Sequence, residues 1–278
     1  MNYINPMTGT ALSGFPVITM RGRSIPDLRG IVRAFVSHDE YANSDPYPKD
    51  AEREERILAY SRNIVLPLLP ELNDKPFRIL DAGCGTGDWL SAILAESNGS
   101  HQIDVAEYSQ QALMHCLDRN IDIDNACLFD ANFMPFPPET YDVILAINLF
   151  EHITAPVLFL ERLVACLKPG GVALVTTPSR YTFKHLLHAA IGHKKRLIHE
   201  NHVTEYSVGQ MTEMVRFVGG RVTGTSGSAL VVPGEGLRFL TRLLAPLTQK
   251  VITDIVHSHH LMHRTVYYRI EPSSQTQN

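Results

Sequence analysis

The chain has 278 residues, of which 44% are apolar and 19% charged, a composition typical of one large or two small globular domains. Its 25 basic and 29 acidic residues give a net charge of -4, which argues against nucleic acid as a partner. The four scattered cysteines are expected to be free thiols. With neither a signal-like start nor an apolar run of about 18 residues, the sequence predicts a cytoplasmic protein without an integral membrane segment.

Residues 1–75 are expected to form an arm and a helix that cap the main domain. Glycine and proline recur through residues 1–30 without any sustained period, which predicts an arm or loop. Residues 57–69 follow an acidic stretch, and their apolar positions fall near helical spacing. Pro67 and Pro70 are expected to end this helix. One helix is therefore predicted ahead of the main domain.

From Phe77 onward, short apolar runs alternate with amphipathic stretches, which indicates an α/β domain with a mostly parallel sheet. The predicted strands are 77–81, 102–107, 126–129, 141–147 and 171–177, and the predicted helices are 88–96, 109–119 and 156–167. Ser109 is a predicted N-cap, and Ser207 with Gln210 has capping-box spacing. A last strand is predicted at 265–270, so the main domain spans 76–270 and residues 271–278 form a disordered tail.

The segment FRILDAGCGTGDWL places a glycine-rich loop between a strand and a helix. Glycine has no Cβ, so the backbone can turn tightly and approach a ligand, and the helix behind the loop presents free N–H groups. The next predicted strand carries two acids, Asp104 in its middle and Glu107 at its end. An acid at that end can hold a ribose diol, so we favour Glu107, with a solvated loop acid as the alternative.

The glycine-rich segment and the acid after it resemble those of class I S-adenosylmethionine-dependent methyltransferases, specifically those similar to the ubiquinone and menaquinone biosynthesis enzymes. LDAGCGTG is close to the first motif of that family, and its third glycine comes one residue earlier than in the dinucleotide motif. Further segments resemble later family motifs in the same order: FDANFMPFPPETYDVILAINLFEHI, LVACLKPGGVALVTTP and NHVTEYSVGQMTEMVRFVGGRV. The resemblance covers about residues 77–225. It implies a Rossmann-like, seven-stranded, mostly parallel sheet with helices on both faces and a C-terminal insertion that forms a cap.

The resemblance also implies S-adenosylmethionine as cofactor, with contacts from nine positions near strand ends. These are Asp81, Gly83, Cys84 and Gly85 at the amino-acid end, Glu107 at the ribose, Asp130 and Ala131 at the adenine, and Asn148 and Leu149 beside the methionine part and the methyl group. Cys84 is interpreted as a small residue that fits the turn rather than as a nucleophile, because no activating base is near it in sequence.

A sulfonium is already an activated methyl donor, so the main task of such a protein is to align an acceptor with the methyl group. A hydroxyl acceptor would benefit from a general base, and His152 of the Glu151-His152 pair is our catalytic candidate. The alternative is a structural histidine that anchors the following turn. O- or C-methylation is favoured over N-methylation.

Nine of the 13 histidines lie between His185 and His263. Since no carboxylate or cysteine accompanies them at ligand spacing, we expect no metal site. His202 is instead a candidate for substrate contact, because related enzymes often place an active-site cap there. Residues 180–205 and 229–263 are expected to be insertions that cap the substrate.

Two segments of these insertions leave alternatives open. Residues 180–196 carry five basic residues and no acid, which is typical of a solvated face, although an anionic substrate or a membrane surface is an alternative. Leucines recur at helical spacing in residues 237–247, which favours core packing over a lid for a lipid-like substrate or a peripheral membrane helix.

The sequence thus predicts methyl transfer by in-line displacement to a small-molecule or lipid-like acceptor. Two alternatives remain: a catalytically silent relative that binds the cofactor, and, less favoured because of the glycine spacing, an NAD(P)-dependent oxidoreductase. No motif specifies an oligomeric state.

Overall fold

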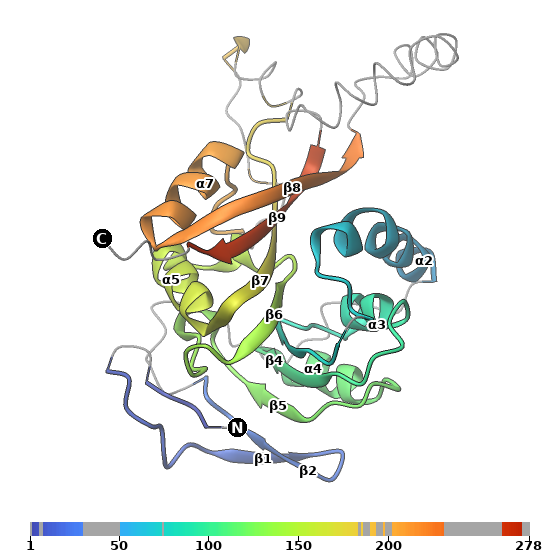
Figure 1. Ribbon diagram of the computed structural model, residues 1–278, viewed down its shortest axis with the longest axis vertical. Coiled ribbons are helices and arrows are strands. Elements are labelled where there is room, and N and C mark those ends of the chain that lie inside the picture. Colours follow the sequence, from blue (N-terminus) through green and yellow to red (C-terminus); the bar gives the residue numbers. More distant parts are fainter. Residues whose placement is uncertain are drawn as a thin grey trace.

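The computed structural model describes residues 2–5, 8–29, 51–73, 75–182, 185, 190–192, 197, 202–230 and 263–273. In this part of the chain, seven strands form one sheet with the order β5-β4-β3-β6-β7-β9-β8 (Figure 1). Their bounds are β3 Arg78–Ala82, β4 Gln102–Glu107, β5 Asn125–Leu128, β6 Tyr141–Ala146, β7 Leu167–Pro178, β8 Gly220–Leu230 and β9 His263–Pro272. Strands β3 to β7 pair in parallel, and β9 is antiparallel to both of its neighbours. The predicted Rossmann-like, mostly parallel sheet is confirmed.

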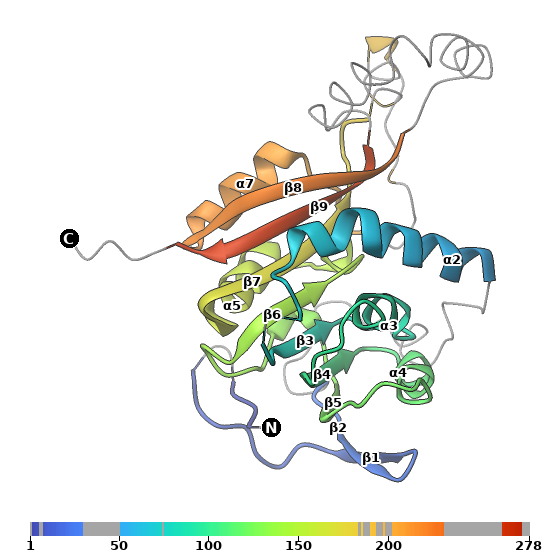
Figure 2. The ribbon, with the colours of Figure 1, turned by 45° about the vertical axis from the view of Figure 1, so that its right-hand side comes forward.

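Helices cover both faces of the sheet (Figure 2). Side chains of β3 and β6 alternate between two apolar cores, with Leu80 and Ile144 in one and Ile79 and Val143 in the other. Helices α5 (Pro156–Cys166) and α7 (Val208–Phe217) pack into the first core. Helices α3 (Asp88–Leu94) and α4 (Gln110–Leu117) pack into the second. A sheet buried on both faces explains why these strands are apolar throughout.

The helix ahead of the main domain begins earlier than predicted. Helix α2 spans Ala51–Tyr60 and so includes the acidic stretch, whose glutamates in the first turn suit the positive end of the helix dipole. A π-helical turn at Ser61–Val65 and a 3-10 turn at Leu66–Leu68 follow. Pro67 therefore lies inside this last turn rather than ending the α-helix.

The glycines and prolines of residues 1–30 predicted an arm or loop, but part of this segment is a hairpin. Strands β1 (Val17–Met20) and β2 (Arg23–Pro26) form an antiparallel hairpin whose turn residues, Arg21 and Gly22, both have positive φ. Beyond it, Asp27 forms a bridge with Leu128 of β5, and the Leu28 amide donates to the Leu128 carbonyl at 2.7 Å. The arm thus lies along the outer edge of β5.

The predicted helix caps are confirmed: Ser109 accepts from the Ala112 amide, and Ser207 with Gln210 forms a complete capping box. Strand β7 runs through the Lys-Pro-Gly-Gly turn, so it starts earlier than predicted, and β9 reaches Pro272, so the tail does not begin at 271. Much of 180–205, nearly all of 229–263 and residues 274–278 lie outside the described residues. None of the described helices has the length and apolar character needed to cross a bilayer.

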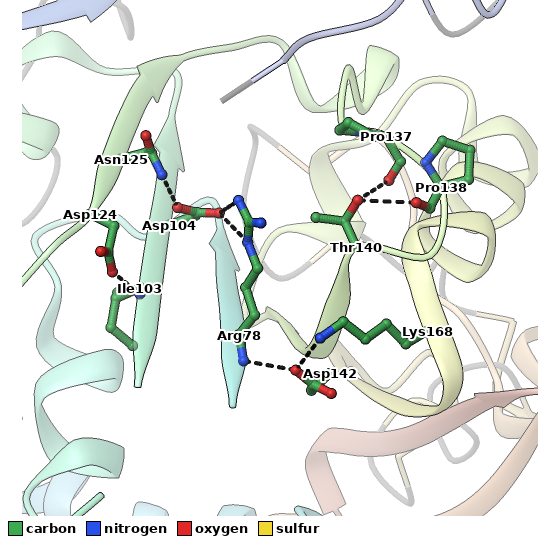
Figure 3. Close-up of polar contacts among 10 residues, drawn as sticks. All are labelled: Arg78, Ile103, Asp104, Asp124, Asn125, Pro137, Pro138, Thr140, Asp142 and Lys168. Atoms are coloured by element: carbon green, nitrogen blue, oxygen red, sulfur yellow. Dashed lines mark hydrogen bonds and ion pairs between the residues drawn. The ribbon is translucent and has the colours of Figure 1, made fainter. Parts of the chain in front are cut away.

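Asp104 and Asp142 are structural residues, and Figure 3 shows their partners. Asp104 is buried in the middle of β4, where it pairs with Arg78 and accepts from the Asn125 amide. Asp142, at the start of β6, accepts from the backbone of Arg78 at 2.9 Å and from Lys168 at 2.7 Å. Because Asp104 is engaged by these partners in the middle of β4, Glu107 is the acid that stands at the carboxyl end of this strand.

Candidate functional site

The glycine loop that follows β3 is fixed to the end of β4. The amides of Gly83 and Cys84 donate to the Ala106 carbonyl at 2.8 and 3.1 Å. The Gly85 amide donates to Oε2 of Glu107 at 2.8 Å. Gly83 and Gly85 have φ values of +75° and +54°, a region that residues with a Cβ adopt at a cost. The carboxyl ends of β3 and β4 therefore form one rigid unit, at the edge where open α/β sheets bind ligands.

Glu107 is buried and held in a single orientation. Its Oε1 accepts hydrogen bonds from the amides of Tyr108 at 2.8 Å and Ser109 at 2.9 Å. Burial raises the pKa of Glu107, although these amides and that of Gly85 oppose the rise. A carboxylate fixed in this way is pre-oriented for a ligand's hydroxyl groups.

Asp81 is buried beside Glu107 and has an unsatisfied oxygen. Its side chain is 2% exposed, and Oδ2 has no hydrogen-bond partner among the described residues. Burial, reinforced by the charge of Glu107, raises the pKa of Asp81 to about 7. Both causes disfavour the charged form, so a cation bound here would relieve them. The ammonium and sulfonium groups of S-adenosylmethionine fit this chemistry.

Leu149 approaches the glycine loop from the end of β6. A Cβ at Gly83 would lie only 3.0 Å from Cδ1 of Leu149, so the missing side chain is what permits this contact. Asn148, just before it, has a φ of +54°, and its amide donates to Oγ1 of Thr176 in β7 at 2.8 Å. The two residues predicted to border the methyl group thus lie where β6 meets the loop.

Asp130 and Ala131 follow β5 and join the same edge. The Phe129 amide donates to the Glu107 carbonyl at 3.0 Å, which places Asp130 next to the end of β4. Asp130 is buried, and its Oδ1 accepts from the backbone and the side-chain amide of Asn132 at 2.9 and 2.8 Å. Ala131 is buried in the short helix that follows. The structure therefore brings all nine predicted cofactor positions to the carboxyl edge of the sheet.

Cys84 lacks the environment of a reactive thiol. Its hydrogen bond with Cys116 and its burial both raise its pKa well above the ordinary value. All four cysteines are free, as predicted, and all four are buried. A neutral, buried thiol is a poor nucleophile, which agrees with our interpretation of Cys84 as a turn residue.

His152 lies in a second polar cluster that sequence reasoning did not foresee. The chain after β6 places Glu151 and His152 in a 3-10 turn, Phe150–His152, and the segment before α7 brings His202 and Glu205 against it. The Val203 amide donates to the Glu151 carbonyl at 2.8 Å. His152 and His202 had each been singled out, but about fifty residues separate them, so spacing gave no sign that they meet.

Comparison with known proteins agrees with this geometry. A family model for a methyltransferase domain matches residues 50–221, more than half of the chain. A probable S-adenosylmethionine-dependent methyltransferase of Mycolicibacterium smegmatis is 27% identical over 57% of this chain and 56% of its own length. A ubiquinone biosynthesis O-methyltransferase of Parvibaculum lavamentivorans is 33% identical over 42% of this chain and 47% of its own. The chain spans about half the length of these curated relatives.

Among solved structures, a methyltransferase from Thermotoga maritima, described as a possible histamine N-methyltransferase, has a TM-score of 0.55. The match covers 80% of this chain and 94% of that chain at 17% identity, which shows the shared fold. S-adenosylmethionine is the cofactor that this family and fold imply, and the buried carboxylates of the glycine loop fit it. The chain belongs to the methyltransferase-domain family.

Proposed function

We propose that the chain transfers the methyl group of S-adenosylmethionine to a small-molecule acceptor. The proposal depends on the buried Oδ2 of Asp81, which has no hydrogen-bond partner among the described residues, in a side chain beside the tethered carboxylate of Glu107. Two buried acids disfavour each other's charge unless a cation joins them. The donor supplies a methyl group on a positively charged sulfur, and the two carboxyl groups of this site can take the opposite charge when that cation is bound.

The chain's own residues would bind the donor and orient it. Asp81 and the loop backbone from Gly83 to Gly85 would hold the amino-acid end, and Glu107 would accept hydrogen bonds from both ribose hydroxyls. Asp130 would accept from the adenine amino group, with the backbone of Ala131 beside the ring. Asn148 and Leu149 would line the path to the methyl group, where alignment of the acceptor lowers the barrier to transfer.

His152 is the residue that we assign to the acceptor's proton. It follows Leu149 by three residues, and so lies close in sequence to the residues that border the methyl group. For a hydroxyl acceptor, the proton passes to His152 while the oxygen attacks the methyl carbon and the carbon-sulfur bond breaks. O-methylation is the reaction that would use His152 as a base, and we rank it first. C-methylation ranks second and N-methylation last.

The remaining parts of the proposal concern the acceptor side and the location. Residues 1–75, with the insertions at 180–205 and 229–263, would shape the pocket for a small or lipid-like acceptor. The four free, buried cysteines agree with a reducing compartment, so we place the protein in the cytoplasm.

Calorimetric titration tests the proposal. We expect S-adenosylmethionine and S-adenosylhomocysteine to bind with micromolar affinity, and NADH not to bind. If neither adenosyl ligand bound, the proposal would be overturned. Stoichiometric binding without product from a broad panel of hydroxyl acceptors would instead identify a catalytically silent member of the family.

Turnover of His152→Ala tests the assigned proton acceptor. We expect a loss of more than about tenfold in turnover with donor affinity unchanged, because the residue acts on the acceptor only. Unchanged turnover would remove His152 from the mechanism.

A further inference from the structure

Glu151, His152 and His202 place three metal-ligating atoms close together. Their ligand atoms, one from each side chain, all lie within 4.8 Å of one another. The backbone fixes the arrangement, because the amides of Val203 and Thr204 both donate to the Glu151 carbonyl, at 2.8 and 3.4 Å. The two imidazole rings meet at 86° with their centres 5.2 Å apart. The cluster is therefore built by two segments that are pinned to each other.

The carboxylate of Glu151 lacks a hydrogen-bond partner for one of its oxygens. The residue is 3% exposed, and Oε2 is buried without a partner among the described residues. A second acid, Glu205, is fully buried, and its Oε1 lies 3.5 Å from Nδ1 of His202. Buried polar atoms nearly always have a partner, so a buried oxygen with none among the described residues, in a carboxylate that lies within 4.8 Å of two imidazoles, points to a missing positive ligand.

We propose that Glu151, His152 and His202 bind one divalent transition metal ion, with zinc as the best match. Two imidazole nitrogens and one carboxylate oxygen are a donor set used by zinc sites that keep a position open for a further ligand. Imidazole favours zinc, cobalt, nickel or iron over magnesium and calcium, which prefer oxygen donors. Glu205 would orient His202 from behind, as carboxylates do for metal-bound histidines. The proposal departs from our sequence-based expectation of no metal site.

The ligand atoms need only a small movement to close on an ion. Donor atoms about 2.1 Å from a tetrahedral zinc ion lie roughly 3.4 Å apart. The present upper limit of 4.8 Å therefore requires side-chain movements on the order of 1 Å, which χ rotations of Glu151 and the histidines supply.

The chemical role of the ion rests on the proposed function. An acceptor hydroxyl bound at the open position would lose its proton to solvent more readily, because a bound cation lowers the pKa of a coordinated oxygen. The oxygen would then form a bond to the methyl carbon as the carbon-sulfur bond breaks, giving the methyl ether and S-adenosylhomocysteine. With the ion bound, His152 would serve as a ligand and the acceptor's proton would pass to solvent, whereas without the ion His152 would accept that proton itself.

The experiment is a titration of chelator-treated full-length protein with Co²⁺, followed by its visible absorption, and with Zn²⁺ by calorimetry. We expect one ion per chain in addition to any background, with an absorption band typical of cobalt bound by nitrogen and oxygen. His202→Ala and Glu151→Gln should each weaken this binding by at least tenfold, in line with the loss of a ligand. His115→Ala, which removes a histidine on α4, serves as the matched control and should bind as the native chain does.

Folding controls show whether a loss of metal binding comes from a lost ligand or from an unfolded variant. Circular dichroism and thermal melting of each variant verify that it is folded, and His202→Gln provides a second test if His202→Ala is not. Equal cobalt spectra and stoichiometries in the native chain and the folded variants would overturn the site. Binding of S-adenosylhomocysteine is measured separately without metal, so failure of the proposed function and failure of the metal site can be told apart.

Discussion

Oε2 of Glu107 lies 2.8 Å from the amide nitrogen of Gly85, and this contact ties the acid at the end of β4 to the loop that follows β3. The carboxylate thus helps to shape the loop and also faces the position that we assign to the ribose. A ligand that binds here meets a side chain whose rotamer is already fixed, so less conformational entropy is lost on binding.

Replacement of Glu107 by alanine should weaken binding of S-adenosylhomocysteine by roughly 10- to 100-fold, because hydrogen bonds to a charged group contribute about 1.5–3 kcal/mol. Calorimetry measures the change. The control is Glu213→Ala on the exposed face of α7, which should leave affinity within twofold. Equal affinities for the two variants would remove Glu107 from the ligand site.

The affinity for S-adenosylmethionine should depend on pH through Asp81. Its pKa of about 7 means that the ligand-free side chain is mostly protonated below pH 7. A bound ammonium favours the carboxylate, so binding releases a proton and affinity rises from pH 6 to 8, by up to about tenfold per unit below pH 7. The same raised pKa makes the stability of the ligand-free protein fall as the pH rises from about 4 toward 7.

Calorimetry in buffers of different ionisation enthalpy measures the proton release directly. Asp81→Asn is the matched variant, since it keeps the size of the side chain and removes its titration. We expect a flatter pH profile for this variant, with any slope from the ligand's own amino group retained. Identical profiles for both proteins would show that Asp81 does not sense the ligand's charge.

Gly83→Ala should destabilise the protein more than Gly170→Ala does. Both glycines have φ near +75°, so each substitution carries a backbone cost of about 1–2 kcal/mol. A Cβ at Gly170 would meet open space, whereas one at Gly83 would lie 3.0 Å from Leu149. Urea unfolding measures the two losses in the free energy of unfolding. In the double variant Gly83→Ala/Leu149→Ala, the part of the loss that comes from the clash with Leu149 should be recovered, and the backbone part should remain. Equal losses would contradict the close approach.

Asn132 should stabilise the loops that surround Asp130. Its Oδ1 accepts from the backbone and hydroxyl of Thr154 at 2.9 Å each and from the Ala155 amide at 3.2 Å. Because each such bond contributes about 0.5–1.5 kcal/mol, Asn132→Ala should lower the free energy of unfolding by about 1–3 kcal/mol. Asn63→Ala, at an exposed asparagine on the π-helical turn, is the control and should change it by less than about 0.5 kcal/mol. Equal changes in the free energy of unfolding for Asn132→Ala and Asn63→Ala would mean that the hydrogen bonds of Asn132 do not stabilise the protein.

The sequence was most informative where local chemistry determines local structure. The Ser109 cap, the Ser207–Gln210 capping box and β4 agree with prediction, because each depends on residues close in the chain. The choice of Glu107 over Asp104 as the ribose acid followed from position along a strand and stays a prediction; the structure shows that Asp104 is engaged by Arg78 and Asn125 instead.

Features that depend on contacts distant in the chain were not predicted. The β1-β2 hairpin has little apolar alternation, and its position depends on pairing beyond it with β5. Similarly, the meeting of Glu151 with His202 requires the end of β6 and the segment before α7 to be neighbours. A periodicity argument contains no such information, since it treats each segment alone.

The arm along β5 also bears on how separate molecules meet. A strand at the border of a sheet offers unpaired backbone groups to any other extended chain, which is a common route to aggregation. Here Asp27 and Leu28 occupy the Leu128 end of that border, and Arg23 donates to the Ile123 carbonyl at 2.6 Å just before the strand. A chain adding to this border at the Leu128 end must first displace the arm, so residues 27 and 28 also protect that part of the edge against self-association.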